Sequence, residues 1–225
     1  MKTTAVIVAA GSGSRFNSET PKQFLEIMGK PIIAHVIERF EAAPSVDEIV
    51  LVLSADRINE VTAVRTDKVK TITSGGDSRA SSVLNGLNAV SDETSVVAVH
   101  DGARPLVTVD EIERTIEKAK QTGAACLVAP VTDTIKSIRG DEIAATLDRN
   151  RLRRALTPQV FRIDVLKKAF EGVEPDDTVT DECYLVEKLG HPIAIVEGSP
   201  RNIKVTHKED LAFVEAVLNL ETGNC

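Results

Sequence analysis

Short, continuous apolar runs recur along the chain, and most are followed by a segment with helical periodicity. The runs lie at residues 5–9, 48–53, 69–73, 96–100, 124–130 and 193–197. Their hydrophobicity is continuous rather than alternating, which is typical of strands that are buried on both faces. These six runs are therefore predicted to be strands of one buried sheet.

Apolar residues at helical spacing fill most of the intervals between these runs. The predicted helices cover residues 31–42, 81–90, 109–121, 165–170, 181–189 and 209–220. Pro31 stands where a proline suits the first turn of a helix. Regular alternation of strand and helix predicts an α/β fold with a doubly wound, mostly parallel (Rossmann-like) sheet and right-handed crossovers.

The alternation breaks between residues 132 and 162. Residues 133–143 are polar and resemble a hairpin with a turn at Gly140, and residues 146–150 continue the extended pattern. Two interpretations stay open from composition alone, a solvated surface ribbon and an oligomerisation arm. We expect a single domain over residues 1–225 with an extended β-arm at about 132–160.

Charge and cysteine content narrow the class of protein. The chain has 225 residues, 27 basic and 34 acidic, with a formal charge of −7. That balance disfavours nucleic acid as the main partner, although local groups of cations can bind a small phosphorylated ligand. Three widely spaced cysteines, Cys126, Cys183 and Cys225, give neither a disulfide framework nor a thiolate zinc site and indicate a reducing compartment. With no signal peptide or membrane span in the pattern, we expect a cytoplasmic protein without a membrane partner.

Three polar loops follow predicted strands of this sheet. They cover residues 11–15, 75–79 and 101–105. Such sheets bind ligands beyond the carboxyl ends of their strands, so we expect the three loops to share one site.

The first of these loops has the composition of a phosphate site. Its glycines allow backbone N–H groups to approach an anion, and Arg15 and Lys22 supply cations. A loop that only turns the chain is the alternative. Phe16 breaks the dinucleotide fingerprint, and the Gly-Lys-Ser/Thr of a Walker A loop is absent.

The motifs taken together resemble the 2-C-methyl-D-erythritol 4-phosphate cytidylyltransferase family over nearly the whole chain. They are Ala9-Ala10-Gly11-Ser12-Gly13-Ser14-Arg15, Pro21-Lys22-Gln23, Gly75-Gly76-Asp77-Ser78-Arg79, His100-Asp101-Gly102-Ala103-Arg104-Pro105, Thr157-Pro158-Gln159, Thr180-Asp181-Glu182 and Asn202-Ile203-Lys204-Val205-Thr206. The resemblance implies transfer of CMP from CTP to 2-C-methyl-D-erythritol 4-phosphate, with release of pyrophosphate, in non-mevalonate isoprenoid biosynthesis.

The resemblance implies that Arg15, Lys22 and Lys204 are the catalytic cations. They would hold the phosphates and stabilise the transition state, because bringing two polyanions together is a task of positioning and electrostatics. For Lys22 the alternative is a solvated loop cation, and for Arg15 a helix cap. Lys204 lies in an apolar, strand-like pattern, where an unpaired ammonium is costly, and this favours a bound anion.

The resemblance also implies a nucleotide-binding set in which small residues and backbone groups read the cytosine and ribose. Its members are Ala9, Ala10, Gly11, Gly13, Arg15, Lys22, Gly76, Asp77, Ser82, Asp101, Gly102 and Lys204. For Asp77, and for Ser78 beside it, the alternative or additional role is to cap the following helix.

Asp101 is the candidate ligand for Mg²⁺, because a carboxylate at a strand end can reach a metal that bridges phosphate oxygens. The alternative is that Asp101 only pairs with Arg104, and His100 is interpreted as a packed or hydrogen-bonding residue. For the acceptor, the resemblance points to Asp101, Arg104, Thr134, Arg149, Thr157, Thr180 and Lys204. Thr134 and Arg149 lie on the arm, so a homodimer with arm exchange is implied.

Three other functions compete with this interpretation. Ribitol-5-phosphate cytidylyltransferase shares CTP and a related opening motif, but the stretches 75–79 and 202–206 favour the methylerythritol enzyme. A non-catalytic nucleotide-sensing module is disfavoured because the phosphate cations and Asp101 are both retained. A nicotinamide oxidoreductase is disfavoured by the broken fingerprint at Phe16.

Overall fold

A seven-stranded sheet forms the centre of the protein. The computed structural model describes residues 1–11, 21–58, 66–176 and 178–223. Among these residues the central sheet has the order β11-β7-β10-β6-β1-β4-β5. Its strands are β1 (Lys2–Ala9), β4 (Glu48–Leu53), β5 (Val69–Ser74), β6 (Thr94–Asp101), β7 (Ala124–Pro130), β10 (Arg153–Arg162) and β11 (Ala194–Glu197). Only β10 runs antiparallel to its neighbours, so the predicted mostly parallel α/β sheet is confirmed.

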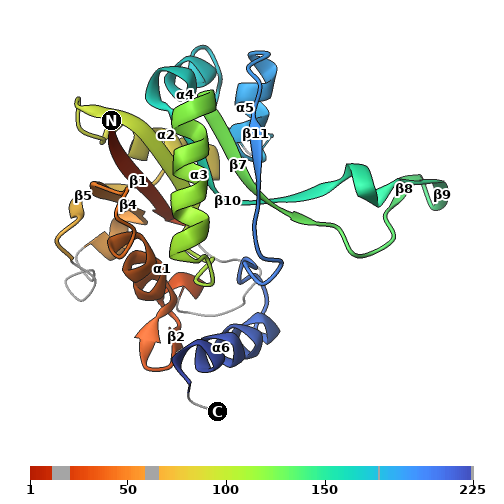
Figure 1. Cartoon of the computed structure of the whole chain (residues 1–225), viewed down its shortest axis with the longest axis horizontal. Coiled ribbons are helices and arrows are strands. Elements are labelled where there is room, and N and C mark those ends of the chain that lie inside the picture. The colour runs from red at the N-terminus through yellow and green to blue at the C-terminus, as the bar shows by residue number, and fades with distance from the viewer. Residues whose placement is uncertain (12–20, 59–65, 177, 224–225) are drawn as a thin grey trace.

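Helices cover both faces of this sheet. They are α1 (Ile32–Glu41), α2 (Arg79–Asn88), α3 (Val109–Thr122), α4 (Ile163–Phe170) and α5 (Glu182–Lys188), whereas α6 (Glu209–Thr222) packs in a separate apolar cluster. Helices α1 and α3 pack against the face that carries Ile7 and Leu51. Helices α2, α4 and α5 pack against the opposite face, with Val6 and Val52. Figure 1 shows α3 lying across one side of the sheet and the other helices arranged around it.

Burial on both faces explains the continuous hydrophobicity of the strand runs. In β1, the neighbouring residues Val6 and Ile7 point to opposite faces, and each is 0% exposed. Burying a side chain of this size contributes roughly 1.5–3 kcal/mol, so both faces of the strand stabilise the sheet. An alternating pattern would have predicted a sheet with one solvated face.

Strand β10 was not predicted. The proposed arm at about 132–160 includes it, yet residues 156–161 are buried between β6 and β7. Its apolar pattern is interrupted by Thr157, Pro158 and Gln159, so the run does not have the composition of a core strand. The hairpin that does project consists of β8 (Lys136–Arg139) and β9 (Glu142–Thr146), followed by the short 3₁₀ helix η4 (Arg149–Arg151).

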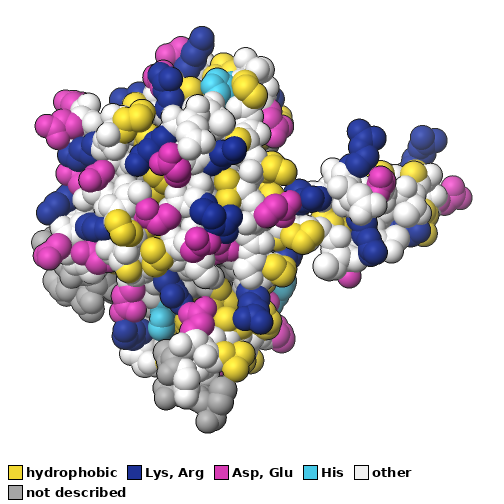
Figure 2. Space-filling model, in the orientation of Figure 1, with side chains coloured by type: hydrophobic (Ala, Val, Ile, Leu, Met, Phe, Trp, Pro, Cys, Tyr) yellow, Lys and Arg dark blue, Asp and Glu magenta, His cyan; other side chains and the backbone are white. Residues whose placement is uncertain are grey.

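This hairpin and the residues that flank it, 132–151, which we call the arm, extend away from the rest of the protein (Figures 1 and 2). Ile138 is 74% exposed and Ile143 is 67% exposed, which is unusual for isoleucine. Figure 2 shows Lys and Arg side chains standing out from the same hairpin.

A smaller apolar cluster joins α6 to the segment that follows the first loop. Helix η2 (Lys22–Phe24) leads into the two-residue strands β2 (Glu26–Ile27) and β3 (Lys30–Pro31), and Ile27 packs with Val205 and Val217. Pro31 ends β3 and precedes α1, so the prediction that it is the first helical residue was wrong by one position. Within the described residues, no helix combines the length and apolar character that a membrane crossing needs.

Candidate active site

A cavity of about 530 Å³ opens at the carboxyl ends of β1, β5 and β6, where Gly11 meets the predicted loops 75–79 and 101–105; residues 12–15 of the first predicted loop lie outside the described residues. Its volume falls in the range of small-molecule sites. The lining residues are Val8, Ala9, Ala10, Gly11, Lys22, Gln23, Gly76, Asp77, Ser78, Arg79, Ser82, Asp101, Gly102, Ala103, Lys204 and Thr206. The sheet topology brings these residues together, because parallel neighbours end at the same edge.

Gln23 fixes the start of the first loop. Its side-chain Nε2 donates to the carbonyl oxygens of Ala9 at 2.6 Å and Gly11 at 2.9 Å, and the side chain is buried. Next to it, Lys22 Nζ donates to the carbonyl oxygen of Val205 at 2.7 Å. Lys22 is therefore held at the cavity wall by the chain segment that carries Lys204.

The second loop, residues 75–79, ends at the N-terminus of α2, where a side chain caps the helix. Ser78 is the N-cap of α2 and forms a capping box with Ser81, so the proposed capping role applies to Ser78. The N–H of Gly76 donates to Ser82 Oγ at 3.1 Å. A Cβ at Gly75 would lie 2.2 Å from the Cβ of Ala10, so only glycine allows the first and second loops to approach this closely.

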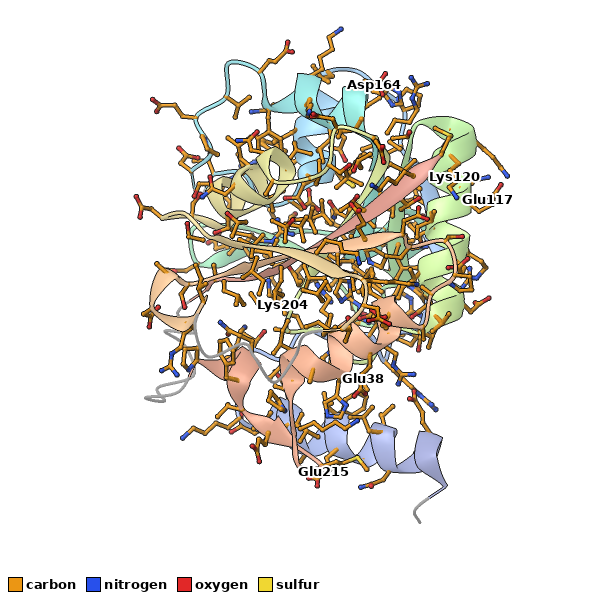
Figure 3. The ribbon with its side chains drawn as sticks, turned by 90° about the vertical axis from the view of Figure 1, so that its left-hand side faces the viewer. Glu38, Glu117, Lys120, Asp164, Lys204 and Glu215 are labelled. Carbon is orange, nitrogen blue, oxygen red and sulfur yellow. The ribbon has the colours of Figure 1, made fainter. Side chains whose placement is uncertain are left out.

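Asp101, at the end of β6, is surrounded by three cations. Arg79 Nε donates to its Oδ1 at 3.0 Å. Lys204 Nζ lies 3.0 Å from Oδ2, and Arg104 Nε lies 3.4 Å from the same oxygen. Figure 3 shows Lys204 between the sheet and the part formed by β2 and α6.

The charges of this cluster support one another. Burial works against the charged form of Asp101, but the Arg79 and Lys204 cations outweigh it and hold the pKa of this carboxyl well below its usual value. Burial also works against the charge of Arg79, yet Asp101 and Glu182 together raise its pKa. Three cations, Arg79, Arg104 and Lys204, face two carboxylates, Asp101 and Glu182, so the cluster retains a net positive charge for an anionic ligand.

His100, which precedes Asp101 on β6, is hydrogen-bonded to residues that contact Asp101. Its Nε2 donates to the carbonyl oxygen of Arg104 at 3.2 Å, and its Nδ1 accepts from the hydroxyl of Thr157 at 3.0 Å. The backbone N–H of Asp101 donates to the same hydroxyl at 3.2 Å. We assign the ring protons from these partners, because a carbonyl oxygen only accepts. Burial lowers the pKa of His100 to about 3, so the ring is neutral at neutral pH.

The segment that carries Lys204 is attached to the turn after β6. Arg104 Nη1 donates to the carbonyl oxygen of Asn202 at 3.0 Å, and the N–H of Val205 donates to the carbonyl oxygen of Ala103 at 2.8 Å. The segment has irregular structure, although its apolar pattern resembles a strand. These two attachments bring Lys204 to Asp101 from a distant part of the sequence.

Helix α5 brings a second carboxylate to Arg79. Glu182 accepts from Nη1 at 2.7 Å and from Nη2 at 3.1 Å, and its side chain is 0% exposed. The start of the helix is tied to β10, because Gln159 donates to Asp181 at 2.9 Å and accepts from the N–H of Cys183 at 3.0 Å. The motifs 157–159 and 180–182 therefore build one junction.

The structure brings most of the predicted nucleotide-binding residues to the cavity. Those on its wall are Ala9, Ala10, Gly11, Lys22, Gly76, Asp77, Ser82, Asp101, Gly102 and Lys204. Gly13 and Arg15 lie outside the described residues. The predicted acceptor residues are more dispersed. Arg104 contacts Asp101. Thr157 is buried, and its hydroxyl is hydrogen-bonded to the N–H of Asp101 and to Nδ1 of His100. Thr180 is exposed near α5, and Thr134 and Arg149 are exposed on the arm segment.

Several residues of the site had no role predicted from the sequence. Arg79, Gln23 and Glu182 lie within quoted motifs, and their position inside those motifs was the available signal. Their roles depend on partners far along the chain, such as the pairing of Arg79 with Glu182 across 103 positions. No local pattern reveals such pairs.

Comparison with known proteins gives a consistent result. A family model described as 2-C-methyl-D-erythritol 4-phosphate cytidylyltransferase matches residues 3–220. Proteins named as this enzyme are similar to the chain: one from Alkaliphilus oremlandii is 41% identical, with 96% of this chain and 95% of that protein aligned. Another, from Syntrophus aciditrophicus, is 39% identical, with 99% of this chain and 98% of that protein aligned.

Solved structures agree with the sequence comparison. The 4-diphosphocytidyl-2C-methyl-D-erythritol synthase from Anaerococcus prevotii superposes with a TM-score of 0.85 at 25% identity, covering 97% of this chain and 96% of that one. The 2-C-methyl-D-erythritol 4-phosphate cytidylyltransferase from Francisella tularensis superposes with a TM-score of 0.82 at 31% identity, covering 96% and 99%.

Proposed function

The chain belongs to the 2-C-methyl-D-erythritol 4-phosphate cytidylyltransferase family, and from that premise we propose how its cavity carries out the reaction. The enzyme transfers CMP from CTP to 2-C-methyl-D-erythritol 4-phosphate and releases pyrophosphate in the non-mevalonate pathway. The observation that carries the proposal is the group of three cations around Asp101 at the carboxyl edge of the sheet.

The glycine-rich end of the cavity is assigned to the nucleoside. A pyrimidine fits where small residues and backbone groups line the wall, and backbone amides and carbonyls can read the edge of cytosine. The close approach of Gly75 to Ala10 and the hydrogen bond between Gly76 and Ser82 support this assignment. Asp77, exposed beside Ser82, is assigned to the same subsite.

The cationic end is assigned to the phosphates. Lys22 and Lys204 lie on the wall of the cavity, and the family resemblance adds Arg15 to them. Lys22 is held by the carbonyl oxygen of Val205, which stabilises an ammonium without neutralising it. These cations would neutralise the negative charge that builds up on the α-phosphoryl oxygens and the departing pyrophosphate.

The chemical step needs no general base. A phosphate monoester has a second pKa of about 6, so the acceptor phosphate is largely dianionic at neutral pH. One of its oxygens attacks the α-phosphorus of CTP, and the bond from that phosphorus to the oxygen that bridges to the β-phosphorus breaks. The protein supplies alignment and charge neutralisation. His100, which is buried and neutral, takes no part in proton transfer in this scheme.

Asp101 is the residue that would hold a divalent cation. Among the described residues, no group of three His, Cys, Asp or Glu side chains gathers into a metal cage. One carboxylate in a phosphate-binding cavity fits Mg²⁺, which takes its remaining ligands from phosphate oxygens and water. When bound, the ion would neutralise triphosphate charge. The carboxylate of Asp101 would be its protein ligand, and Lys204, 3.0 Å from that carboxylate, would remain at the site as a cation for the phosphates.

The acceptor is assigned to the side of Asp101 that faces Arg104 and Lys204. The guanidinium of Arg104 offers a cation, with its Nε 3.4 Å from Asp101 Oδ2. Thr157 fixes the backbone there, because its hydroxyl accepts from the N–H of Asp101. Thr180 completes the set of residues on the same subunit. The cations leave the acceptor phosphate a positively charged position next to the nucleotide.

Thr134 and Arg149 are assigned to the acceptor site of a second copy of the chain. The exposed isoleucines Ile138 and Ile143 of the arm support a homodimer in which each arm packs against its partner. Arg149 Nη1 donates to the carbonyl oxygen of Thr132, which fixes its side chain at the base of the arm.

A coupled pyrophosphate assay with two acceptors tests the proposal. The wild-type protein should release pyrophosphate from CTP with 2-C-methyl-D-erythritol 4-phosphate and far more slowly with ribitol 5-phosphate. A marked preference for ribitol 5-phosphate, or CTP binding without any release, would overturn it.

A further inference from the structure

Arg79 joins two buried carboxylates that come from different elements. Its Nε donates to Asp101 Oδ1 at 3.0 Å, and its two terminal nitrogens donate to both oxygens of Glu182. A guanidinium fork that pairs in this bidentate way is fixed in orientation as well as charge. Arg79 therefore connects the start of α5 to the end of β6.

The burial of the three side chains makes this connection rigid. Glu182 is 0% exposed and the side chain of Asp101 is 8% exposed, whereas the side chain of Arg79 is 24% exposed and lies on the cavity wall. The backbone at Glu182 is held in turn, because Gln159 on β10 binds both Asp181 and the N–H of Cys183. Glu182 thus has a fixed position from which to hold Arg79.

We propose that Glu182 and Arg79 are positioning residues that orient the carboxyl group of Asp101 toward the acceptor side of the cavity. The inference rests on the proposed function, in which the acceptor lies on the side of Asp101 that faces Arg104 and Lys204. Each oxygen of Asp101 has its own partner: Arg79 occupies Oδ1, so Oδ2 faces the cations of the acceptor side.

Glu182 also prevents Arg79 from competing for the nucleotide. A guanidinium has five N–H groups, and the hydrogen bonds of Arg79 to Asp101 and Glu182 use three of them. Because Arg79 lies on the cavity wall, an arginine without its buried partner would turn toward an incoming triphosphate. Asp101 would then lose the contact on Oδ1, and only Lys204 and Arg104, both on Oδ2, would hold its carboxyl group.

The charge of Glu182 depends on its pairing with Arg79. Burial raises the pKa of Glu182, and the charge of Arg79 partly offsets this effect. Removing one partner of a buried pair leaves the other uncompensated, so a neutral isostere is the mildest perturbation. Glutamine is such an isostere, because it keeps the volume of Glu182 but presents an NH₂ group to the guanidinium.

The test is steady-state kinetics of E182Q, R79K and the double variant in the pyrophosphate assay, with each substrate varied in turn. E182Q and R79K should each lower kcat/KM for the acceptor by about 10- to 100-fold, the equivalent of one charge-assisted hydrogen bond. At saturating Mg²⁺, so that a weaker hold of Asp101 on the ion is masked, the KM for CTP should stay unchanged or fall. In the R79K background, E182Q should change kcat/KM for the acceptor by less than about threefold, because lysine lacks the guanidinium through which Glu182 acts on Asp101.

E113Q is the matched control. Glu113 also accepts two hydrogen bonds with its two oxygens, from the N–H and hydroxyl of Ser45, but it lies on α3 away from the cavity. It should keep wild-type kinetics. R79K, which retains the charge, carries the test if E182Q fails to fold.

The possible outcomes separate the inference from the function. Folded variants with wild-type acceptor kinetics would overturn the inference, and so would equal losses for both substrates, which indicate a merely structural role. Absence of pyrophosphate release by the wild-type protein would overturn the proposed function and the inference with it.

Discussion

Replacing His100 with glutamine should make the protein less sensitive to acid. The imidazole is 0% exposed, and its ring lies against Phe40 with 4.9 Å between centroids. Both ring nitrogens are engaged, one with the carbonyl oxygen of Arg104 and one with the hydroxyl of Thr157. Protonation would place a donor against the Thr157 hydroxyl, which already donates to the ring, and would add a buried charge.

The magnitude follows from the two pKa values of this histidine. In the folded state burial lowers the pKa to about 3, compared with 6.5 in the unfolded chain. Below the unfolded value, the unfolded state binds a proton that the folded state does not, so stability falls as the pH falls. Between about pH 7 and about pH 5 the loss from this one group is about 2 kcal/mol.

Urea unfolding followed by circular dichroism measures the effect. The free energy of unfolding of wild type and H100Q is compared at about pH 7 and about pH 5, at one protein concentration. H100Q should be less stable than wild type at about pH 7, yet it should lose about 2 kcal/mol less on acidification. Identical pH dependence in the two proteins would refute a buried, neutral His100.

Three further substitutions test the site. K22A should lower kcat by about 10²- to 10³-fold and change the KM for CTP little, because its contact strengthens as charge develops; a higher KM alone would contradict that role. R149A should raise the KM for the acceptor and leave that for CTP unchanged, and unaltered acceptor kinetics would remove the arm from the site. T157V should lower the free energy of unfolding by about 2–4 kcal/mol, because the N–H of Asp101 and a ring nitrogen of His100 lose their partner, whereas T157S should match wild type.

Most of the fold could be predicted because its signals are local. Each strand run is continuous in hydrophobicity since both faces are buried, and β1, where Val6 and Ile7 face opposite helices, is an example. Strand β10 was missed because Thr157 and Gln159 serve the site and the α5 junction from within a core strand. At these two positions polar residues needed for hydrogen bonds stand where the prediction of a core strand requires apolar ones.

The site could be predicted in part for the same reason. Lining residues such as Gly76 and Asp101 belong to short motifs at strand ends, and the rule that ligands bind there placed them together. The contacts of Asp101 depend on long-range geometry: its partner Arg79 comes from α2, and Glu182, the second carboxylate bound by Arg79, comes from α5. Charge pairs of this kind have no sequence period, so only the folded chain reveals them.

The most direct test of the account is a crystal structure with CTP and Mg²⁺ bound. Phosphate oxygens should lie within hydrogen-bonding distance of Lys22 and Lys204, and the cytosine should lie against Gly75 and Gly76. A triphosphate bound elsewhere, with Lys204 still paired to Asp101, would contradict the claim that the cations gathered at this strand edge form the nucleotide site.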